Sequence, residues 1–168
     1  HAACRQAGRA PTPFPGLETP ATIGGFPEAL NTAMRDPSHV LITGASSGIG
    51  AALARRYARA GRILSLCGRD DRRLGAVAQA CRALGAEVDA QILDVVDRDA
   101  VAAWIARRDA VAPIELAFAN AGISGGTSGG AASDGLVEPR AQHDAIMAVN
   151  VDGVVNTVNA ALRAMAPR

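Results

Sequence analysis

The sequence predicts an open, doubly wound α/β sheet, with parallel strands and helices on both faces. Short apolar runs alternate along the chain with segments of helical periodicity, in the order βαβαβαβα. The runs are nearly continuous in apolar residues, which is typical of parallel strands covered on both faces. Because parallel crossovers are right-handed, this order favours the strand arrangement 3-2-1-4. A ligand is then expected beyond the carboxyl ends of the strands, where the order reverses between strands one and four.

The first two predicted strands each lead into a predicted helix. Residues 40–43 form a short apolar run that ends in a glycine-rich turn, and residues 48–60 follow with their apolar side chains on one side. Residues 63–67 form the second run. Residues 70–84 then carry apolar side chains at steps of three and four, which is the spacing of one helix face.

The last two strand–helix pairs repeat this pattern. Residues 87–95 are the third predicted strand, and residues 97–111 follow as a helix with Asp97 as its N-cap. Residues 114–119 are the fourth strand. The last and longest helix, 141–165, presents one apolar face along its whole length.

Two stretches lack a regular period. Residues 1–37 hold most of the prolines, and we interpret them as an irregular Pro-rich N-terminal extension with a short helix near residues 27–35. The remainder, 38–168, is one predicted domain. Inside it, the stretch between Gly122 and Pro139 is rich in Gly and Ser and predicts a mobile loop at the rim of a site.

Composition narrows the class of protein. The chain has 168 residues, 49% hydrophobic and 3% aromatic, so we expect one domain with an aliphatic core. A net charge of +1 gives no electrostatic footprint for nucleic acid, and no continuous apolar run reaches the ~20 residues of a membrane span. We therefore expect neither a nucleic-acid nor a membrane partner. Cys4, Cys67 and Cys81 lack metal-ligand spacing, so we interpret them as reduced thiols of a cytoplasmic protein.

A glycine-rich turn follows the first predicted strand and opens the first predicted helix. Gly44 suits a tight turn, Gly48 lets the backbone approach a pyrophosphate, and Gly50 permits close packing of the helix on the strand. The helix N-terminus offers free N–H groups and a positive dipole end to phosphates. The residues expected to bind a dinucleotide here are Thr43, Gly44, Ser46, Ser47, Gly48, Ile49 and Gly50. A P-loop is excluded because no Lys follows the last glycine.

Arg69 lies at the end of the second predicted strand, where dinucleotide folds meet the adenosine ribose. An acid at that place binds the 2′-hydroxyl, whereas an Arg accommodates a 2′-phosphate through a charge-assisted bond. We therefore predict NADP as the cofactor, with NAD as the alternative because Asp70 adjoins the Arg. Arg72 or Arg73 could assist, or could face solvent.

The third and fourth predicted strands also end in polar or small residues. Asp94 and Val95 end the third strand, and the Asp94 carboxylate either accepts from an adenine amino group or caps the helix that follows. Asn120, Ala121 and Gly122 end the fourth strand. The small residues permit close approach of a ribose and nicotinamide, and the Asn amide can tie neighbouring loops.

Asn150 is a polar residue within the apolar face of the last predicted helix. A buried Asn needs hydrogen-bond partners, so we expect a bound water or a backbone carbonyl beside it. The alternative is an Asn that ties two helices together.

Together these motifs resemble the short-chain dehydrogenase/reductase family over residues 39–168. The matching segments are the Thr-Gly-x-x-x-Gly-x-Gly turn, Gly68-Arg69, Asp94-Val95, Asn120-Ala121-Gly122 and Val149-Asn150-Val151. The resemblance implies a Rossmann fold, a nicotinamide cofactor and hydride transfer between that cofactor and a small-molecule carbonyl or alcohol substrate. It also implies that Asp94 contacts adenine, that Asn120 stabilises the strand end, and that Asn150 belongs to the catalytic set by holding a proton-relay water.

The sequence departs from the family at the catalytic residues. The family's catalytic Ser and Tyr-x-x-x-Lys lie beyond the long helix, the chain contains no Lys, and its one Tyr, Tyr57, is on the first helix. We therefore interpret 38–168 as a partial Rossmann domain of an NAD(P)-dependent oxidoreductase, a fragment inactive by itself. A non-catalytic dinucleotide-sensing module and a relative of sugar-nucleotide epimerases stay open as alternatives. The family resemblance also implies a homo-oligomer through helix 141–165.

Overall fold

Four parallel strands form one sheet in the computed structural model, which describes residues 36–125 and 139–168. The strand order is β3-β2-β1-β4, and every neighbouring pair is parallel. The strands are β1 His39–Thr43, β2 Ile63–Gly68, β3 Glu87–Ile92 and β4 Leu116–Phe118. The predicted α/β class, the Rossmann-like architecture and the order 3-2-1-4 are confirmed.

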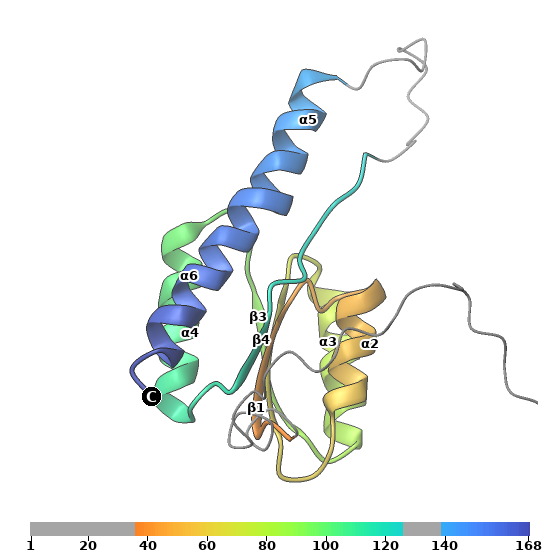
Figure 1. Ribbon diagram of the computed structural model, residues 1–168. Coiled ribbons are helices and arrows are strands. Elements are labelled where there is room, and N and C mark those ends of the chain that lie inside the picture. The colour runs from red at the N-terminus through yellow and green to blue at the C-terminus, as the bar shows by residue number, and fades with distance from the viewer. Residues whose placement is uncertain (1–35, 126–138) are drawn as a thin grey trace, which may run out of the picture.

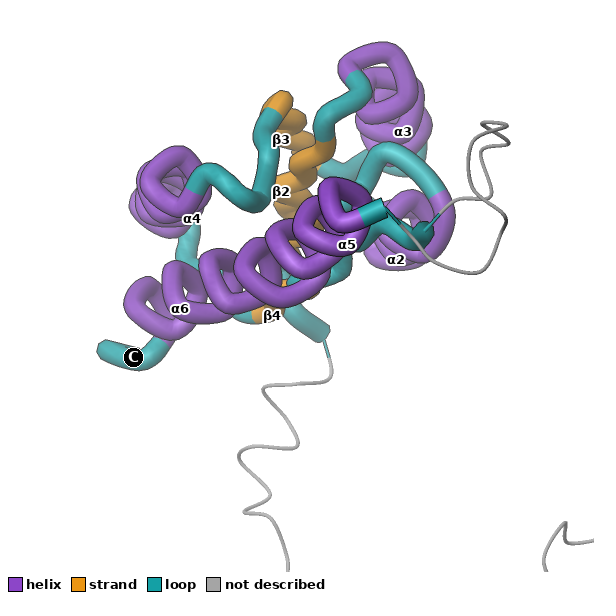
Figure 2. The backbone as a smooth tube through the Cα atoms, turned by 90° about the horizontal axis from the view of Figure 1, so that it is seen from above, coloured by secondary structure: helices purple, strands orange, loops and turns teal. Residues whose placement is uncertain are grey.

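Helices cover both faces of the sheet (Figures 1 and 2). Helices α2 (Gly48–Tyr57) and α3 (Asp71–Ala83) lie on one face, and α4 (Arg98–Val111) and α6 (Gly153–Met165) pack together on the other. A further helix, α5 (Arg140–Met147), continues through a short π-helix, Ala148–Asp152, into α6. Figure 1 shows α5 projecting past the carboxyl edge of the sheet.

Two hydrophobic cores lie between the sheet and these helices, and both are mostly aliphatic. The core beneath α2 and α3 includes Val40, Ile42, Leu64, Leu66, Leu74, Val77, Cys81 and Val88. The core beneath α4 and α6 includes Leu41, Val95, Val101, Trp104, Ile105, Ile114 and Val149. Alternate residues of β1 enter opposite cores, so all five of its residues are buried. This strand therefore fixes the turn that follows it.

Several elements end earlier than their apolar runs predict. Strand β3 ends at Ile92 instead of residue 95, because the Asp94 carboxylate accepts a hydrogen bond from the amide of Val96 at 3.1 Å and turns the chain. Strand β4 spans only three residues. Helix α2 ends at Tyr57 because Ala58 takes an extended conformation. The predicted Asp97 cap of α4 is confirmed by its bond from the Ala100 amide at 3.0 Å.

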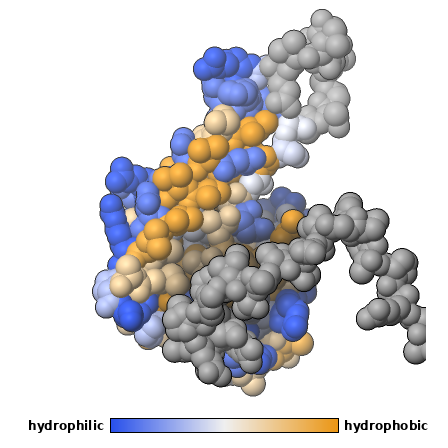
Figure 3. Space-filling view, viewed as in Figure 1, coloured by the Kyte–Doolittle hydropathy of each residue, from blue (hydrophilic) through white to orange (hydrophobic). Residues whose placement is uncertain are grey.

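The helical segment Arg140–Met165 is long and apolar enough, by length and composition alone, to cross a membrane. The sequence-based criterion of ~20 consecutive apolar residues does not detect this segment, because polar residues interrupt its apolar ones. Part of this apolarity serves the core, since Val149, Gly153, Thr157 and Ala161 are buried. Leu162 is also an apolar residue of the predicted helix 141–165, but it is 57% exposed. Figure 3 shows the remaining hydrophobic surface as a band along α5 and α6.

Some sequence-based expectations lie outside the described residues. These are most of the Pro-rich extension, the short helix near 27–35, Cys4, and the Gly/Ser-rich loop beyond residue 125.

Candidate cofactor site

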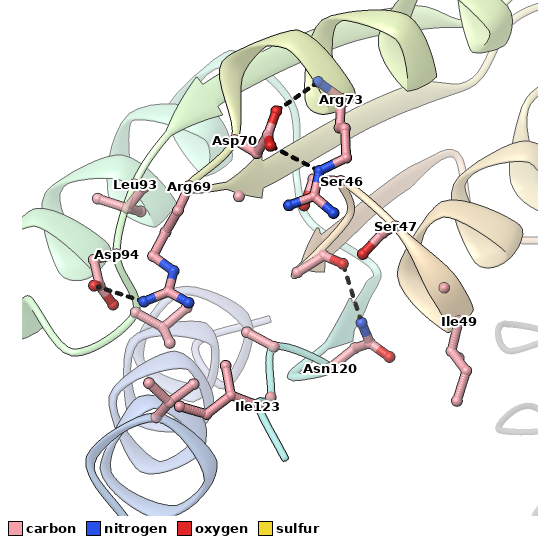
Figure 4. A pocket seen from close by; sticks show the side chains of 17 residues that line it. Ser46, Ser47, Ile49, Arg69, Asp70, Arg73, Leu93, Asp94, Asn120 and Ile123 are labelled. Carbon is pink, nitrogen blue, oxygen red and sulfur yellow. Dashed lines mark hydrogen bonds and ion pairs between the residues drawn. The ribbon is translucent and has the colours of Figure 1, made fainter. Parts of the chain in front are cut away.

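A cavity of about 570 Å³ opens at the carboxyl edge of the sheet, at the switch point between β1 and β4 (Figure 4). Its lining comes from the turn after β1 and from the segments that follow β2, β3 and β4, together with Val149 of the π-helix. Of the predicted site residues, the cavity is lined by Gly44, Ser46, Ser47, Gly48, Ile49, Arg69, Asp94, Val95, Asn120, Ala121 and Gly122. The other predicted site residues, Thr43, Gly50 and Asn150, are not among the residues that line it.

The glycine turn is closed by backbone contacts that leave no room for side chains. Gly44 has a φ of +67°, and a Cβ there would lie 2.7 Å from the Cα of Ala121. A Cβ on Gly50 would lie 2.3 Å from the carbonyl oxygen of Gly44. The predicted tight turn at Gly44 and close packing at Gly50 are both present, and they bring the start of α2 against β1 and β4.

The N-terminus of α2 differs from those of the two following helices. Its N-cap Ser47 is extended and makes no side-chain capping bond, and the first turn carries no acidic residue. Asp70 and Asp97, in contrast, cap α3 and α4 with their carboxylates. The first amides of α2 therefore stay available at the cavity, with the positive end of the helix dipole behind them.

Thr43 and Asn120 hold the turn against β4. The Thr43 hydroxyl accepts from the backbone amides of Asn120 and Ala121 at 3.1 and 3.2 Å, and it donates to the Phe118 carbonyl at 3.3 Å. The Asn120 side-chain amide donates to the Thr43 carbonyl at 3.0 Å and also to the Gly44 carbonyl at 3.4 Å (Figure 4). The predicted role of Asn120 in tying neighbouring loops is present.

Arg69 and Asp94 face each other across the ends of β2 and β3. The Arg69 Nη1 lies 3.7 Å from Asp94 Oδ2, and both side chains are about half exposed. Asp94 does not cap α4, because Asp97 does. The capping alternative is therefore wrong, and Asp94 presents its carboxylate to the cavity.

Asp70 and Arg73 form a second pair on the rim. One Asp70 oxygen caps α3 by accepting from the Arg73 backbone amide at 2.8 Å, and the other accepts from Arg73 Nε at 2.7 Å. These hydrogen bonds, first the backbone one and then the side-chain one, lower the pKa of the Asp70 carboxyl. Asp70 is therefore ionised at neutral pH and orients the Arg73 guanidinium.

Asn150 is bonded to the segment that follows β4. Its side chain accepts from the Ile123 amide and donates to the Ile123 carbonyl, both at 2.8 Å. The expectation of a buried Asn is wrong, since Asn150 is exposed. The expected backbone carbonyl partner is present, and it belongs to Ile123, which lines the cavity.

Val95 joins the cavity to α6. A Cβ on Gly153 would lie 2.5 Å from Val95 Cγ2, and the Asn156 side chain donates to the Val95 carbonyl at 3.0 Å.

Burial raises the pKa of the Cys67 thiol to about 12. This thiol is protonated at neutral pH and is no nucleophile for the cavity.

Six further residues line the cavity: Gly68, Asp70, Arg73, Leu93, Ile123 and Val149. From the sequence, Arg73 is expected only to assist Arg69 or to face solvent, and no binding role is predicted for the other five. Their positions next to strand ends could have indicated Gly68, Leu93 and Ile123. Arg73 could have been chosen over Arg72 as the residue three positions after a capping Asp, because N3 of a helix lies over its N-cap.

The fold and the cavity define an α/β protein of the Rossmann type with its cleft at the switch point of the sheet. Residues 38–168 match the family model described as short chain dehydrogenase. The chain belongs to the short-chain dehydrogenase family.

Similar proteins include dehydrogenases of polyols and sugar acids. The chain is 38% identical over 134 residues to galactitol 2-dehydrogenase (L-tagatose-forming) from Cereibacter sphaeroides, covering 79% of this chain and 49% of that protein. It is 35% identical to gluconate 5-dehydrogenase from Gluconobacter oxydans, covering 78% and 49%. The chain thus spans about half the length of these curated relatives.

Solved structures agree with this assignment. A metagenomic short-chain oxidoreductase in complex with NADP superposes with a TM-score of 0.61 at 33% identity, covering 77% of this chain and 55% of that one. NAD+-bound xylitol dehydrogenase superposes with a TM-score of 0.64 at 28% identity, covering 77% and 48%.

Proposed function

We propose that the cavity binds a nicotinamide dinucleotide, with NADP preferred over NAD, and that the chain is the cofactor-binding part of an oxidoreductase acting on a small carbonyl or alcohol. The observation that carries this proposal is the uncapped N-terminus of α2 at the cavity, reached through the turn at Gly44. A helix start of this kind binds phosphate through free amides and the helix dipole. The similarity to NADP-bound and NAD-bound dehydrogenases supports it.

The residues present fit such a cofactor. Side chains at Gly44 or Gly50 would collide with Ala121 or with the Gly44 carbonyl, so the turn keeps bare backbone at the cavity. Gly48 has open space where a Cβ would stand. The turn from Gly44 to Gly50 would hold the pyrophosphate, and Ser46 and Ser47 would add hydroxyl donors.

The remaining roles follow from position along the cavity. Asp94 and Val95 would hold adenine, because they follow the strand next to β2. Asn120, Ala121 and Gly122 would lie beside the nicotinamide ribose, across the switch point. When bound, the nicotinamide ring exchanges a hydride with the substrate. This chain's residues bind and orient the cofactor.

Among the residues that the structure describes, neither a Tyr nor a Lys lines the cavity, so the Tyr-x-x-x-Lys pair that the family resemblance implies for proton transfer is not found there. Tyr57 is the last residue of α2, its ring centroid lies 5.5 Å from that of Phe118, and it is absent from the cavity lining. The sequence has no Lys. We assign Asn150 to the catalytic set as a positioning residue, because its contacts with Ile123 shape the wall near the switch point.

Titration of the full chain with NADPH and NADH, followed by cofactor fluorescence, tests the proposal. We expect both to bind, and we expect Gly44→Val to abolish binding because its Cβ would meet the Ala121 backbone. Gly75→Ala is the matched control, since nothing lies within 4 Å of its added Cβ. Failure of the folded chain to bind either cofactor, or equal binding by Gly44→Val, would refute the proposal.

We also propose a homo-oligomer through the helical face that α5 and α6 expose. Its apolar residues are Met147, Val151, Val155, Val158 and Leu162, each 41–57% exposed. A contiguous exposed apolar band of this kind is typical of an interface. Sedimentation of the chain should show a self-associated species, and Val158→Asp combined with Leu162→Asp should reduce it to monomer.

A cytoplasmic location completes the proposal. Cys67 and Cys81 are buried free thiols in the described chain, as expected in a reducing compartment. Fractionation of cells that express the protein tests this location directly.

A further inference from the structure

Arg69 and Arg73 reach different parts of the cavity. Both side chains are slightly more than half exposed. In Figure 4, the Arg69 guanidinium points toward Asp94, and the Arg73 guanidinium points toward Ser46. The two guanidinium groups therefore have different neighbours at the end of β2, and each can bind a different part of a ligand.

Gly68 lets the end of β2 approach the glycine turn closely. A Cβ on Gly68 would lie 3.1 Å from the Cβ of Ser46, so the last residue of β2 and the glycine turn are in close contact. Gly68, Ser46 and Arg73 all line the cavity. An adenosine ribose bound beyond the end of β2 would meet these residues.

Arg73 is also held in a defined orientation. Asp70 binds its Nε, which leaves both terminal nitrogens as donors. Arg69 lacks such a bond, since its distance of 3.7 Å to Asp94 is an ion pair without hydrogen-bond geometry. A guanidinium fixed in advance loses less conformational entropy when it binds an anion.

We infer that Arg73, oriented by Asp70, is the main ligand of the cofactor's 2′-phosphate, and that Arg69 stays with Asp94 on the adenine side. This inference rests on the proposed cofactor function and departs from the sequence-based expectation, which gave the phosphate to Arg69. The Ser46 hydroxyl adds a second donor to the same phosphate. Asp70 is a positioning residue that acts through Arg73.

Binding of 2′,5′-ADP and 5′-AMP to the full chain tests the inference, because these two probes differ only in the 2′-phosphate. We expect Arg73→Met to weaken 2′,5′-ADP binding about tenfold to a hundredfold, the usual range for a charge-assisted hydrogen bond. Binding of 5′-AMP should be unchanged. Arg72→Met is the matched control, since Arg72 is exposed on the same helical turn and is outside the cavity lining.

The other outcomes separate the two proposals. If the unmodified chain binds neither probe, the proposed cofactor function fails. If both probes bind and Arg73→Met leaves their ratio unchanged, the inference is overturned while the cofactor site stands. A larger loss in Arg69→Met than in Arg73→Met also overturns it. Arg73→Lys, which keeps the charge without the planar fork, should give an intermediate loss.

Discussion

Thr43 and Asn120 are hydrogen-bonded to each other in both directions. The Thr43 hydroxyl accepts from the Asn120 backbone amide at 3.1 Å, and the Asn120 side chain returns a donor to the Thr43 carbonyl at 3.0 Å. The pair joins the carboxyl ends of β1 and β4, which border the switch point. It thereby ties together the two strand ends that border the cleft in which the cofactor is proposed to bind.

Replacement of Thr43 by Val should destabilise the fold. Thr43 is 1% exposed, so loss of its hydroxyl strands the amides of Asn120 and Ala121 without an acceptor. An unsatisfied buried donor costs about 1–3 kcal/mol, and urea unfolding should show a loss of that order. Thr43→Ser, which keeps the hydroxyl, should lose less. Equal stability of the Val variant and the unmodified chain would contradict this account.

Replacement by Ala should lower the stability of the fold at Gly50 and raise it at Gly75, although both glycines lie in helices. Gly50→Ala places a Cβ 2.3 Å from the Gly44 carbonyl and 2.6 Å from Asn120 Nδ2, so it should unfold more easily and lose NADPH binding. Gly75→Ala meets open space and should gain about 0.5–1 kcal/mol from helix propensity. Thermal unfolding of the two variants checks the contrast, and stabilisation by both would refute it.

The residue pattern alone predicts the order of strands in the sheet. Because crossovers between parallel strands are right-handed, each apolar run can occupy only one position in the sheet. The same holds for the turn at Gly44, since only glycine suits its φ of +67° beside the Ala121 backbone. Asn120 is predictable from its place at a strand end. In these cases the local sequence and the backbone geometry agree, which leaves one solution.

The side-chain arrangement on the rim is not predictable in this way. Which Arg faces Asp94 depends on rotamers and on the Asp70 bond, and neither leaves a periodic signal. The predicted burial of Asn150 is wrong because this residue lies in the π-helix Ala148–Asp152. One extra residue in a turn shifts the following helix face by about 100°, so a regular helical wheel puts Asn150 inside.

Stability should fall as the pH drops below about 6.5, through His39. This side chain is 0% exposed, and burial is the main cause that lowers its pKa, with the Arg108 charge adding to it. The Ala112 carbonyl and the carboxylates of Asp109 and Glu115 oppose the shift. As the pH falls, His39 is therefore protonated in the unfolded chain at a higher pH than in the folded chain. The contribution of neutral His39 to stability is complete above its pKa in the unfolded chain and is lost as the pH falls toward its pKa in the folded chain.

Urea unfolding at about pH 7.5 and about pH 5.5 measures this slope. Neutral His39 donates from Nδ1 to the Ala112 carbonyl and accepts at Nε2 from the Ser65 hydroxyl, both at 2.8 Å. His39→Asn should flatten the pH dependence. His143→Asn makes the same change at an exposed position and should preserve it. If stability still falls with pH to the same extent in His39→Asn, the pH dependence arises from another group.

The contact between Asn150 and Ile123 should control the order of the cavity wall. Asn150→Asp keeps an acceptor for the Ile123 amide but replaces the donor to its carbonyl by a second acceptor, so one bond of 2.8 Å becomes a repulsion. We expect faster hydrogen exchange at the Ile123 amide, by about twofold to tenfold for a bond worth 0.5–1.5 kcal/mol, together with weaker NADPH binding. Asn159→Asp adds the same charge at an exposed position of α6 and should change neither. Unchanged exchange at Ile123 in the Asn150 variant would show that this wall is ordered by other contacts.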